Sequence, residues 1–168
     1  MPGRSRLALD AFGYNVAGGA VLRFGASNVT KNEAAHTENE TAHTGGCLCG
    51  GVRYRIRGAL RGVIACHCAQ CRRTSGHYAA MTSAPSANVE LTAAGPLRWY
   101  KSSDTAERGF CGVCGGNLFW KQVGTDDISI TAGTLDTPTH ITVEQHIFVA
   151  DKSDYYVIND DLPKQQQW

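Results

Sequence analysis

The chain has 168 residues, of which 42% are hydrophobic and 18% are charged, and its formal net charge is +1 at pH 7. This composition provides enough apolar side chains for a folded core and excludes a chain that is disordered throughout. Because phosphate binding depends on excess positive charge, we expect no nucleic-acid partner. No apolar stretch reaches the roughly 18 residues that a membrane-spanning helix needs, so we expect no membrane partner either. The seven cysteines are an unusual count, because disulfides alone would leave one of them unpaired.

The first 44 residues differ from the rest of the chain in that they contain no cysteine. Arg4 and Arg6 precede a short apolar run, as in a signal peptide, but Asp10 interrupts that run almost at once. Residues 27–44 are polar and have no periodicity, which is typical of a linker. We therefore expect a flexible N-terminal extension over residues 1–44 and a single domain over residues 45–165.

From residue 45 onward the sequence predicts short strands separated by turns. Residues 52–57 alternate apolar and basic side chains, which indicates a strand with one buried face. Residues 69–75 predict a helix of one or two turns, and no longer segment keeps a helical period. The expected fold is therefore mainly β, built of short antiparallel strands with few or no long helices. The other expected strands are residues 63–66, 78–82, 89–91, 97–100, 117–121, 128–131 and 141–149.

The seven cysteines lie in three short clusters, and cysteines one or two residues apart form a disulfide only with strain. Such spacing suits tetrahedral zinc, because two sulfurs on a tight turn can reach the same ion. Four of the seven thiols would complete the coordination of one tetrahedral zinc ion, and the remaining three would leave one position open on a second. This division predicts two zinc ions per chain, a structural one and a catalytic one with an open position. The predicted structural ligands are Cys47, Cys49, Cys111 and Cys114, and the predicted catalytic ligands are Cys66, Cys68 and Cys71.

Other assignments of the same cysteines stay open from the sequence alone. A rival partition pairs the first cluster with Cys66 and Cys68 and leaves Cys71 with the last cluster. His77 could supply a fourth ligand to the group of three and make that group structural. His67 lies between two cysteines and could be a ligand, but adjacent residues point in different directions, so we expect it to contact the ligands or line the pocket. An iron–sulfur cluster would need a fourth nearby thiolate, whereas a thiol redox switch would need an empty group.

Five stretches of the sequence resemble the glutathione-dependent formaldehyde-activating (GFA) enzyme family, which shares its domain with centromere protein V. They are GGCLCGGVRYRI (45–56), ACHCAQCRRTSG (65–76), ERGFCGVCGGNLFW (107–120), ITAGTLD (130–136) and HIFVADKSDYY (146–156). The resemblance runs from Gly45 to about Pro163 with the cysteine spacings intact, and one small departure falls at Gly116-Asn117. It implies a zinc-tied fold of sheets arranged like a tent, with the same four structural and three catalytic cysteine ligands.

The resemblance also implies a reaction, that of a carbon–sulfur lyase similar to S-(hydroxymethyl)glutathione synthase. Such an enzyme joins a thiol, glutathione, to formaldehyde or a related small aldehyde. An open zinc position suits this reaction, because zinc lowers the pKa of a bound thiol and polarises an aldehyde oxygen. Arg72, Arg73 and Arg108 are candidates for binding the carboxylates of glutathione and for offsetting the charge of the thiolates.

Two further expectations concern the setting of the protein. The alternative to an enzyme is a non-catalytic zinc-binding module that takes part in protein interactions. Because metal-binding thiols must stay reduced, we expect a cytoplasmic location.

Overall fold

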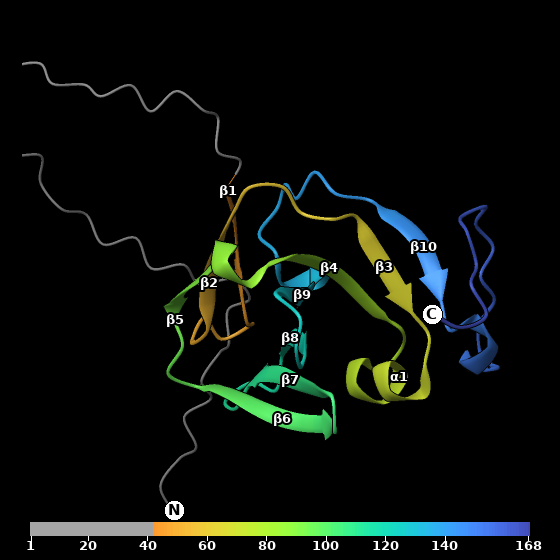
Figure 1. Ribbon diagram of the computed structural model, residues 1–168, viewed down its shortest axis with the longest axis horizontal. Helices are drawn as coiled ribbons and strands as arrows, with labels where there is room; N and C mark the ends of the chain where they lie inside the picture. Colours follow the sequence, from red (N-terminus) through yellow and green to blue (C-terminus); the bar gives the residue numbers. More distant parts are fainter. Residues whose placement is uncertain (1–41) are drawn as a thin grey trace, which may run out of the picture. The chain divides into compact units, whose positions relative to one another are not determined.

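The computed structural model describes residues 42–168, and in this part of the chain a single α-helix accompanies ten strands (Figure 1). The predicted mainly β fold is therefore confirmed. The helix, α1 (Ala69–Ser75), has the predicted bounds. The predicted extension of residues 1–44 lies outside the described residues except for its last three, which belong to β1 (Ala42–Gly46). None of the helices in residues 42–168 has the length and apolar character needed to cross a membrane.

The strands form two sheets. In the smaller sheet, β2 (Arg53–Arg57) lies between β1 and β5 (Val89–Ala93). The larger sheet has the order β10-β3-β4-β9-β8-β7-β6. Neighbouring strands are antiparallel throughout, except that β10 runs parallel to β3. The strands of the larger sheet are β3 (Val63–Cys66), β4 (Ala79–Pro85), β6 (Leu97–Ser103), β7 (Ala106–Cys111), β8 (Asn117–Gln122), β9 (Asp127–Thr131) and β10 (Val143–Ile147).

Two strands, β1 and β7, are missing from the sequence prediction. In β7, charged residues and Gly109 interrupt the apolar alternation that would identify a strand. Pairing with β6 on one side and β8 on the other holds it in the sheet nevertheless. The rings of Trp99 and Phe119 stack with centroids 6.1 Å apart, and a Cβ at Gly109 would lie 3.1 Å from both side chains. Glycine in β7 therefore leaves room for an aromatic pair contributed by its two neighbours.

The core lies between the two sheets. Val52, Tyr54 and Ile56 are at most 1% exposed, whereas the arginines that alternate with them face outward. This confirms the predicted buried face of residues 52–57. Leu118 of β8 and Ile130 of β9 belong to the same buried cluster, so one core joins both sheets. A second, smaller cluster contains Ile64, Cys66, Cys71, Ala79 and Ile147.

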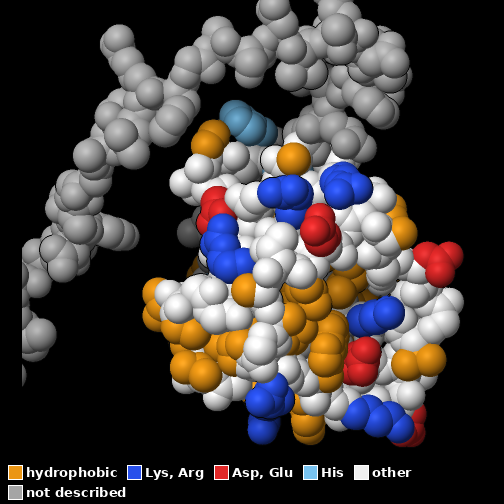
Figure 2. Space-filling view, turned by 90° about the vertical axis from the view of Figure 1, so that its left-hand side faces the viewer, with side chains coloured by type: hydrophobic (Ala, Val, Ile, Leu, Met, Phe, Trp, Pro, Cys, Tyr) orange, Lys and Arg blue, Asp and Glu red, His pale blue; other side chains and the backbone are white. Residues whose placement is uncertain are grey.

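Hydrophobic side chains also gather on the surface, in the lower half of the face shown in Figure 2. Residues of β5 and β6 contribute to a shallow groove of about 270 Å³. Leu91 and Trp99 in this groove are 44% and 42% exposed. The groove is lined by Ser86, Val89, Leu91, Trp99, Glu107, Phe119, Lys121 and Ile128. None of these residues is a cysteine, so the groove is separate from the cysteine groups.

Candidate metal centres

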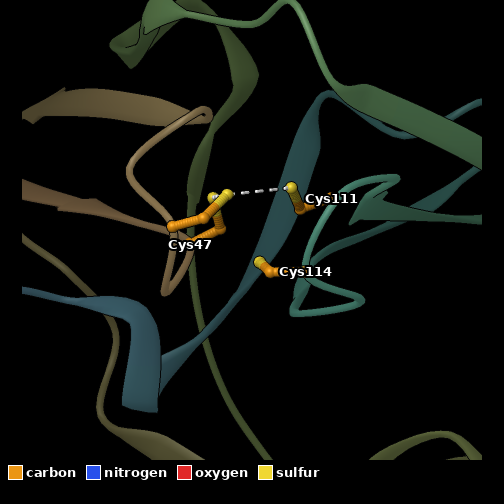
Figure 3. A group of neighbouring side chains, drawn as sticks. Cys47, Cys111 and Cys114 are labelled. Carbon is orange, nitrogen blue, oxygen red and sulfur yellow. Dashed lines mark hydrogen bonds between the residues drawn. The ribbon is translucent and has the colours of Figure 1, made fainter. Parts of the chain in front are cut away.

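The first cysteine group joins the two sheets. Cys47 and Cys49 lie on the turn that connects β1 to β2. Cys111 is the last residue of β7, and Cys114 lies on the turn that connects β7 to β8. Figure 3 shows Cys47 facing Cys111 and Cys114. The four sulfur atoms all lie within 4.8 Å of one another. The group therefore cross-links two segments some sixty residues apart in the sequence.

Both turns contain a glycine in the left-handed conformation. Gly50 and Gly115 adopt positive φ angles of 75° and 74°, in the left-handed region that favours glycine. The Gly50 N–H donates to Cys47 O at 3.0 Å, and the Gly115 N–H donates to Cys111 O at 2.8 Å. Each turn therefore reverses the chain tightly and brings its two sulfurs to the same side.

Backbone amides of these turns stabilise thiolate sulfurs. The Val52 N–H donates to Cys47 Sγ at 3.2 Å. Burial alone would raise the pKa of Cys47, but this hydrogen bond and the neighbouring thiols lower it overall. The Gly116 N–H and other donors lower the pKa of Cys114 to about 6. The charged form that binds metal is thus favoured at Cys47 and Cys114. At Cys49 the Gly51 N–H lowers the pKa, but hydrogen bonding with the thiols of Cys47 and Cys111 raises it overall to about 11.

The sulfur separations fit a tetrahedral metal ion. Cys49 Sγ lies 3.5 Å from Cys47 Sγ and 3.7 Å from Cys111 Sγ. Two thiolates on one zinc ion, each bonded at about 2.3 Å, are separated by about 3.8 Å, whereas disulfide sulfurs are about 2 Å apart. All seven cysteines are free thiols. The group could therefore hold a metal ion, and its four sulfur donors are compatible with zinc.

The second group is built on a strand end and a helix start. Cys66 is the last residue of β3, Cys68 caps the N-terminus of α1, and Cys71 lies in the first turn of that helix. Their sulfurs lie within 4.8 Å of one another. Cys68 Sγ accepts a hydrogen bond from the Cys71 N–H at 3.4 Å, as the side chain of an N-cap residue does. The helix start therefore places all three sulfurs together.

Protons are unevenly shared within this group. Hydrogen bonds from the thiols of Cys66 and Cys71, together with backbone N–H groups at the start of α1, lower the pKa of Cys68 to about 2. Hydrogen bonding with Cys68 and Cys71, reinforced by burial, raises the pKa of Cys66 well above its ordinary value. Hydrogen bonding within the group thus favours a thiolate at Cys68 over one at Cys66. Metal binding would displace the remaining protons, because the ligands must be deprotonated.

The structure separates the alternatives left open by the sequence. It does not bring Cys71 together with Cys111 and Cys114, as the rival partition requires. His77 Nδ1 lies 3.0 Å from the Tyr155 hydroxyl. Within residues 42–168, no histidine, aspartate, glutamate or fourth cysteine completes the group of three. The group therefore offers three protein ligands in the described part of the chain.

His67 is fully buried and points to other side chains, not to the sulfurs. Its ring nitrogens contact the Tyr156 hydroxyl and His146. Burial, aided by the nearby His146, lowers the pKa of His67 to about 4, which keeps the ring neutral at pH 7. The sequence analysis did not single out Tyr156 or Asp160, which contacts His146 in turn. Neither residue lies in a local pattern that would reveal these contacts.

The three candidate arginines occupy different positions around the group of three. Arg108 Nη2 lies 4.0 Å from Cys71 Sγ and 3.4 Å from Gln70 Oε1. The Nε atoms of Arg108 and Arg72 are buried and have no hydrogen-bond partner within residues 42–168. Arg73 is exposed on α1. The structure therefore brings Arg108 to the sulfurs and leaves donors on two arginines unsatisfied.

Comparisons with known proteins place this arrangement in context. A family model described as "Glutathione-dependent formaldehyde-activating enzyme" matches residues 42–151. The crystal structure of a Rhodobacter sphaeroides protein, a structural-genomics target, is 23% identical in sequence and superposes with a TM-score of 0.49. That match covers 56% of this chain and 88% of the other. No curated protein matches the chain.

Proposed function

The chain belongs to the glutathione-dependent formaldehyde-activating enzyme family, and we propose that it is a zinc-dependent carbon–sulfur lyase acting at the three-cysteine group. Its substrates would be a thiol, glutathione, and formaldehyde or a related small aldehyde. Cys66, Cys68 and Cys71 would hold the catalytic zinc, and Cys47, Cys49, Cys111 and Cys114 the structural zinc. The proposal includes two zinc ions per chain.

One observation carries this proposal: the two cysteine groups differ in the number of ligands they offer. The group of four can complete a tetrahedral site by itself, whereas the group of three leaves a position for another ligand within the described part of the chain. Structural zinc sites are closed, and catalytic zinc sites keep such a position. The difference supports a structural role for one group and a chemical role for the other.

The reaction adds a thiol across a carbonyl bond. The thiol sulfur bonds to the aldehyde carbon, the carbonyl π bond opens, and the thiol proton ends on the oxygen, which gives a hydroxymethyl thioether. The lyase direction breaks the same carbon–sulfur bond and returns the proton to sulfur. Zinc in the group of three would supply Lewis acidity, which lowers the pKa of a thiol and polarises a carbonyl oxygen.

Side chains of this chain would bind and orient the substrate. Arg108 lies beside Cys71, so its charge offsets that of the thiolates. The partly exposed guanidinium groups of Arg108 and Arg72 are suited to a carboxylate, which accepts their N–H donors strongly. Arg73 on the exposed face of α1 offers a further cation. Glutathione has two carboxylates, and we assign them to this set of arginines.

The proposal extends to the boundaries and location of the catalytic unit. We propose that the functional domain is the one predicted for residues 45–165, extended by the residues Ala42–Thr44 of β1, and that the preceding residues are an accessory extension. We also propose a cytoplasmic location, because a reducing compartment keeps seven free cysteines available for metal.

An exchange assay tests the proposed reaction. Nuclear magnetic resonance can follow the interconversion of free formaldehyde and S-hydroxymethylglutathione at equilibrium. The zinc-loaded protein should accelerate this exchange above the uncatalysed rate, and Cys68→Ser should abolish the acceleration. If the wild-type protein carries two zinc ions and leaves the exchange rate unchanged, this pair of substrates is wrong.

A non-catalytic protein-interaction module is the second candidate. The observation that favours it is the groove with the exposed Leu91 and Trp99, which no cysteine lines. Acceleration of the exchange that depends on Cys68 would exclude this candidate, because a binding module would not change the rate.

A further inference from the structure

A chain of hydrogen bonds joins four side chains next to the three-cysteine group. The Tyr156 hydroxyl lies 2.5 Å from His67 Nδ1, and His67 Nε2 lies 2.8 Å from His146 Nδ1. His146 Nε2 in turn lies 2.9 Å from Asp160 Oδ2. His67 and His146 are buried, whereas Asp160 is exposed. The hydrogen-bond chain therefore runs from the interior to the surface.

The carboxylate at the end of this chain sets the direction of its hydrogen bonds. A neutral imidazole has one donor nitrogen and one acceptor nitrogen. The Asp160 carboxylate accepts from the His146 Nε2–H, so His146 Nδ1 accepts from the His67 Nε2–H when both rings are neutral. His67 Nδ1 then accepts from the Tyr156 hydroxyl. Asp160 thereby selects the tautomer of both histidines.

The backbone of His67 is also hydrogen-bonded, to β10. The His67 N–H donates to Ile147 O at 3.0 Å, and Cys66 pairs with Ile147 in the ladder between β3 and β10. The residue between Cys66 and Cys68 thus has its amide and both ring nitrogens bonded to residues beyond position 145. Any rotation of His67 that displaced these cysteines would break hydrogen bonds at a buried position, which is costly.

The segment that carries Asp160 is fastened to β10. The His146 N–H donates to Pro163 O at 2.8 Å, and the Gln165 N–H donates to His146 O at 2.9 Å. Asp160 Oδ1 accepts from the Leu162 N–H at 3.2 Å. Asp160 therefore has a fixed position from which to act on His146.

We propose that Asp160 and His146 are positioning residues for the three-cysteine group, acting through His67 on the placement of Cys66 and Cys68. The inference rests on the proposed function of that group as a metal site. Removal of side chains that orient metal ligands typically weakens metal binding by about 10- to 100-fold. Within residues 42–168, none of the four cysteines of the other group hydrogen-bonds to the side chains that link Tyr156 to Asp160. Its affinity should therefore stay unchanged.

Cobalt(II) titration of the full, metal-free chain tests the proposal, because thiolate-to-cobalt absorption reports both occupancy and geometry. Cys68→Ser assigns the absorption step that belongs to the group of three. In Asp160→Ala, that step should weaken about tenfold or more and change its spectrum, while the other step stays constant. Asp160→Asn keeps an acceptor oxygen toward His146 and should restore most of the affinity. The matched control is Asp161→Ala, since the exposed Asp161 has no side-chain hydrogen bond or ion pair in the part of the chain described here.

Unchanged cobalt affinity and spectrum in Asp160→Ala, or an equal loss at both groups, would overturn the proposal. If that variant does not fold, Tyr156→Phe tests the other end by removing one hydroxyl. It should weaken cobalt binding severalfold at the group of three, and a cobalt affinity equal to that of the wild type would overturn the proposal. A wild-type protein that binds cobalt at both groups without accelerating the exchange refutes the proposed function alone.

Discussion

At the scale of single residues, the net negative charge of a zinc-loaded three-cysteine group calls for a positively charged side chain beside it. Three thiolates around a doubly charged ion leave a formal charge of −1, which opposes the binding of a further thiolate. Arg108 contributes a compensating charge 4.0 Å from Cys71 Sγ. Its buried Nε–H has no partner within residues 42–168, and a buried donor without a partner is destabilising. A carboxylate bound at the partly exposed guanidinium of Arg108 would add a charge-assisted hydrogen bond.

Replacing Arg108 with alanine should therefore weaken substrate binding. Hydrogen bonds to charged groups contribute roughly 1.5–3 kcal/mol, so the KM for glutathione in the exchange reaction should rise by about tenfold or more. Zinc content should stay at the wild-type level. Arg55→Ala is the matched control, because Arg55 is exposed on β2 and makes no side-chain hydrogen bond or ion pair in the described residues. An unchanged KM in Arg108→Ala, and likewise in Arg72→Ala, would remove these arginines from the substrate site.

At the scale of elements, the first turn depends on how closely β1 approaches its neighbours. Gly45 in β1 lies against the Tyr54 hydroxyl, and a Cβ there would lie 2.5 Å from Thr134 O. Tyr54 cannot move aside freely, because it is 1% exposed and its hydroxyl hydrogen-bonds to Thr134 Oγ1 at 2.7 Å. The turn that carries Cys47 therefore needs a residue without a side chain at position 45.

Gly45→Ala should lower the free energy of unfolding by about 1–3 kcal/mol, the usual effect of overpacking a buried site. Denaturant unfolding of the zinc-loaded protein measures the change. Gly133→Ala is the control, because a Cβ at Gly133 would meet no atom within 4 Å and should change stability by less than about 0.5 kcal/mol. Equal stability of the two variants would show that β1 can shift away from Tyr54.

Local patterns explain which elements could be predicted from the sequence. The alternation in residues 52–57 identifies β2, and the helix predicted over residues 69–75 has the bounds of α1. The polar residues of β1 and the charged residues of β7 carry no such pattern. These two strands form because they pair with their neighbours in the sheet. The contact between His67 and Tyr156 spans 89 residues, so only the fold reveals it.

At the scale of the whole molecule, the two cysteine groups are placed for different tasks. The group of four joins a turn of the smaller sheet to a turn of the larger one, and Cys111 within it is completely buried. The group of three lies at one end of β3, against a smaller buried cluster. Loss of metal from the first group would remove the cross-link between the two sheets, whereas loss from the second would affect only a strand end and one short helix.

This difference predicts opposite outcomes for two cysteine-to-serine variants. Cys111→Ser should lower the free energy of unfolding by about 4 kcal/mol or more, because metal binding at a structural site contributes directly to folding. Cys68→Ser should stay folded and lose one metal ion, since serine is a good N-cap for α1 and the core between the sheets is untouched. Metal analysis together with circular dichroism through a denaturant titration distinguishes them. If Cys68→Ser unfolds as readily as Cys111→Ser, both groups are structural, and the three-ligand group would no longer support a catalytic role.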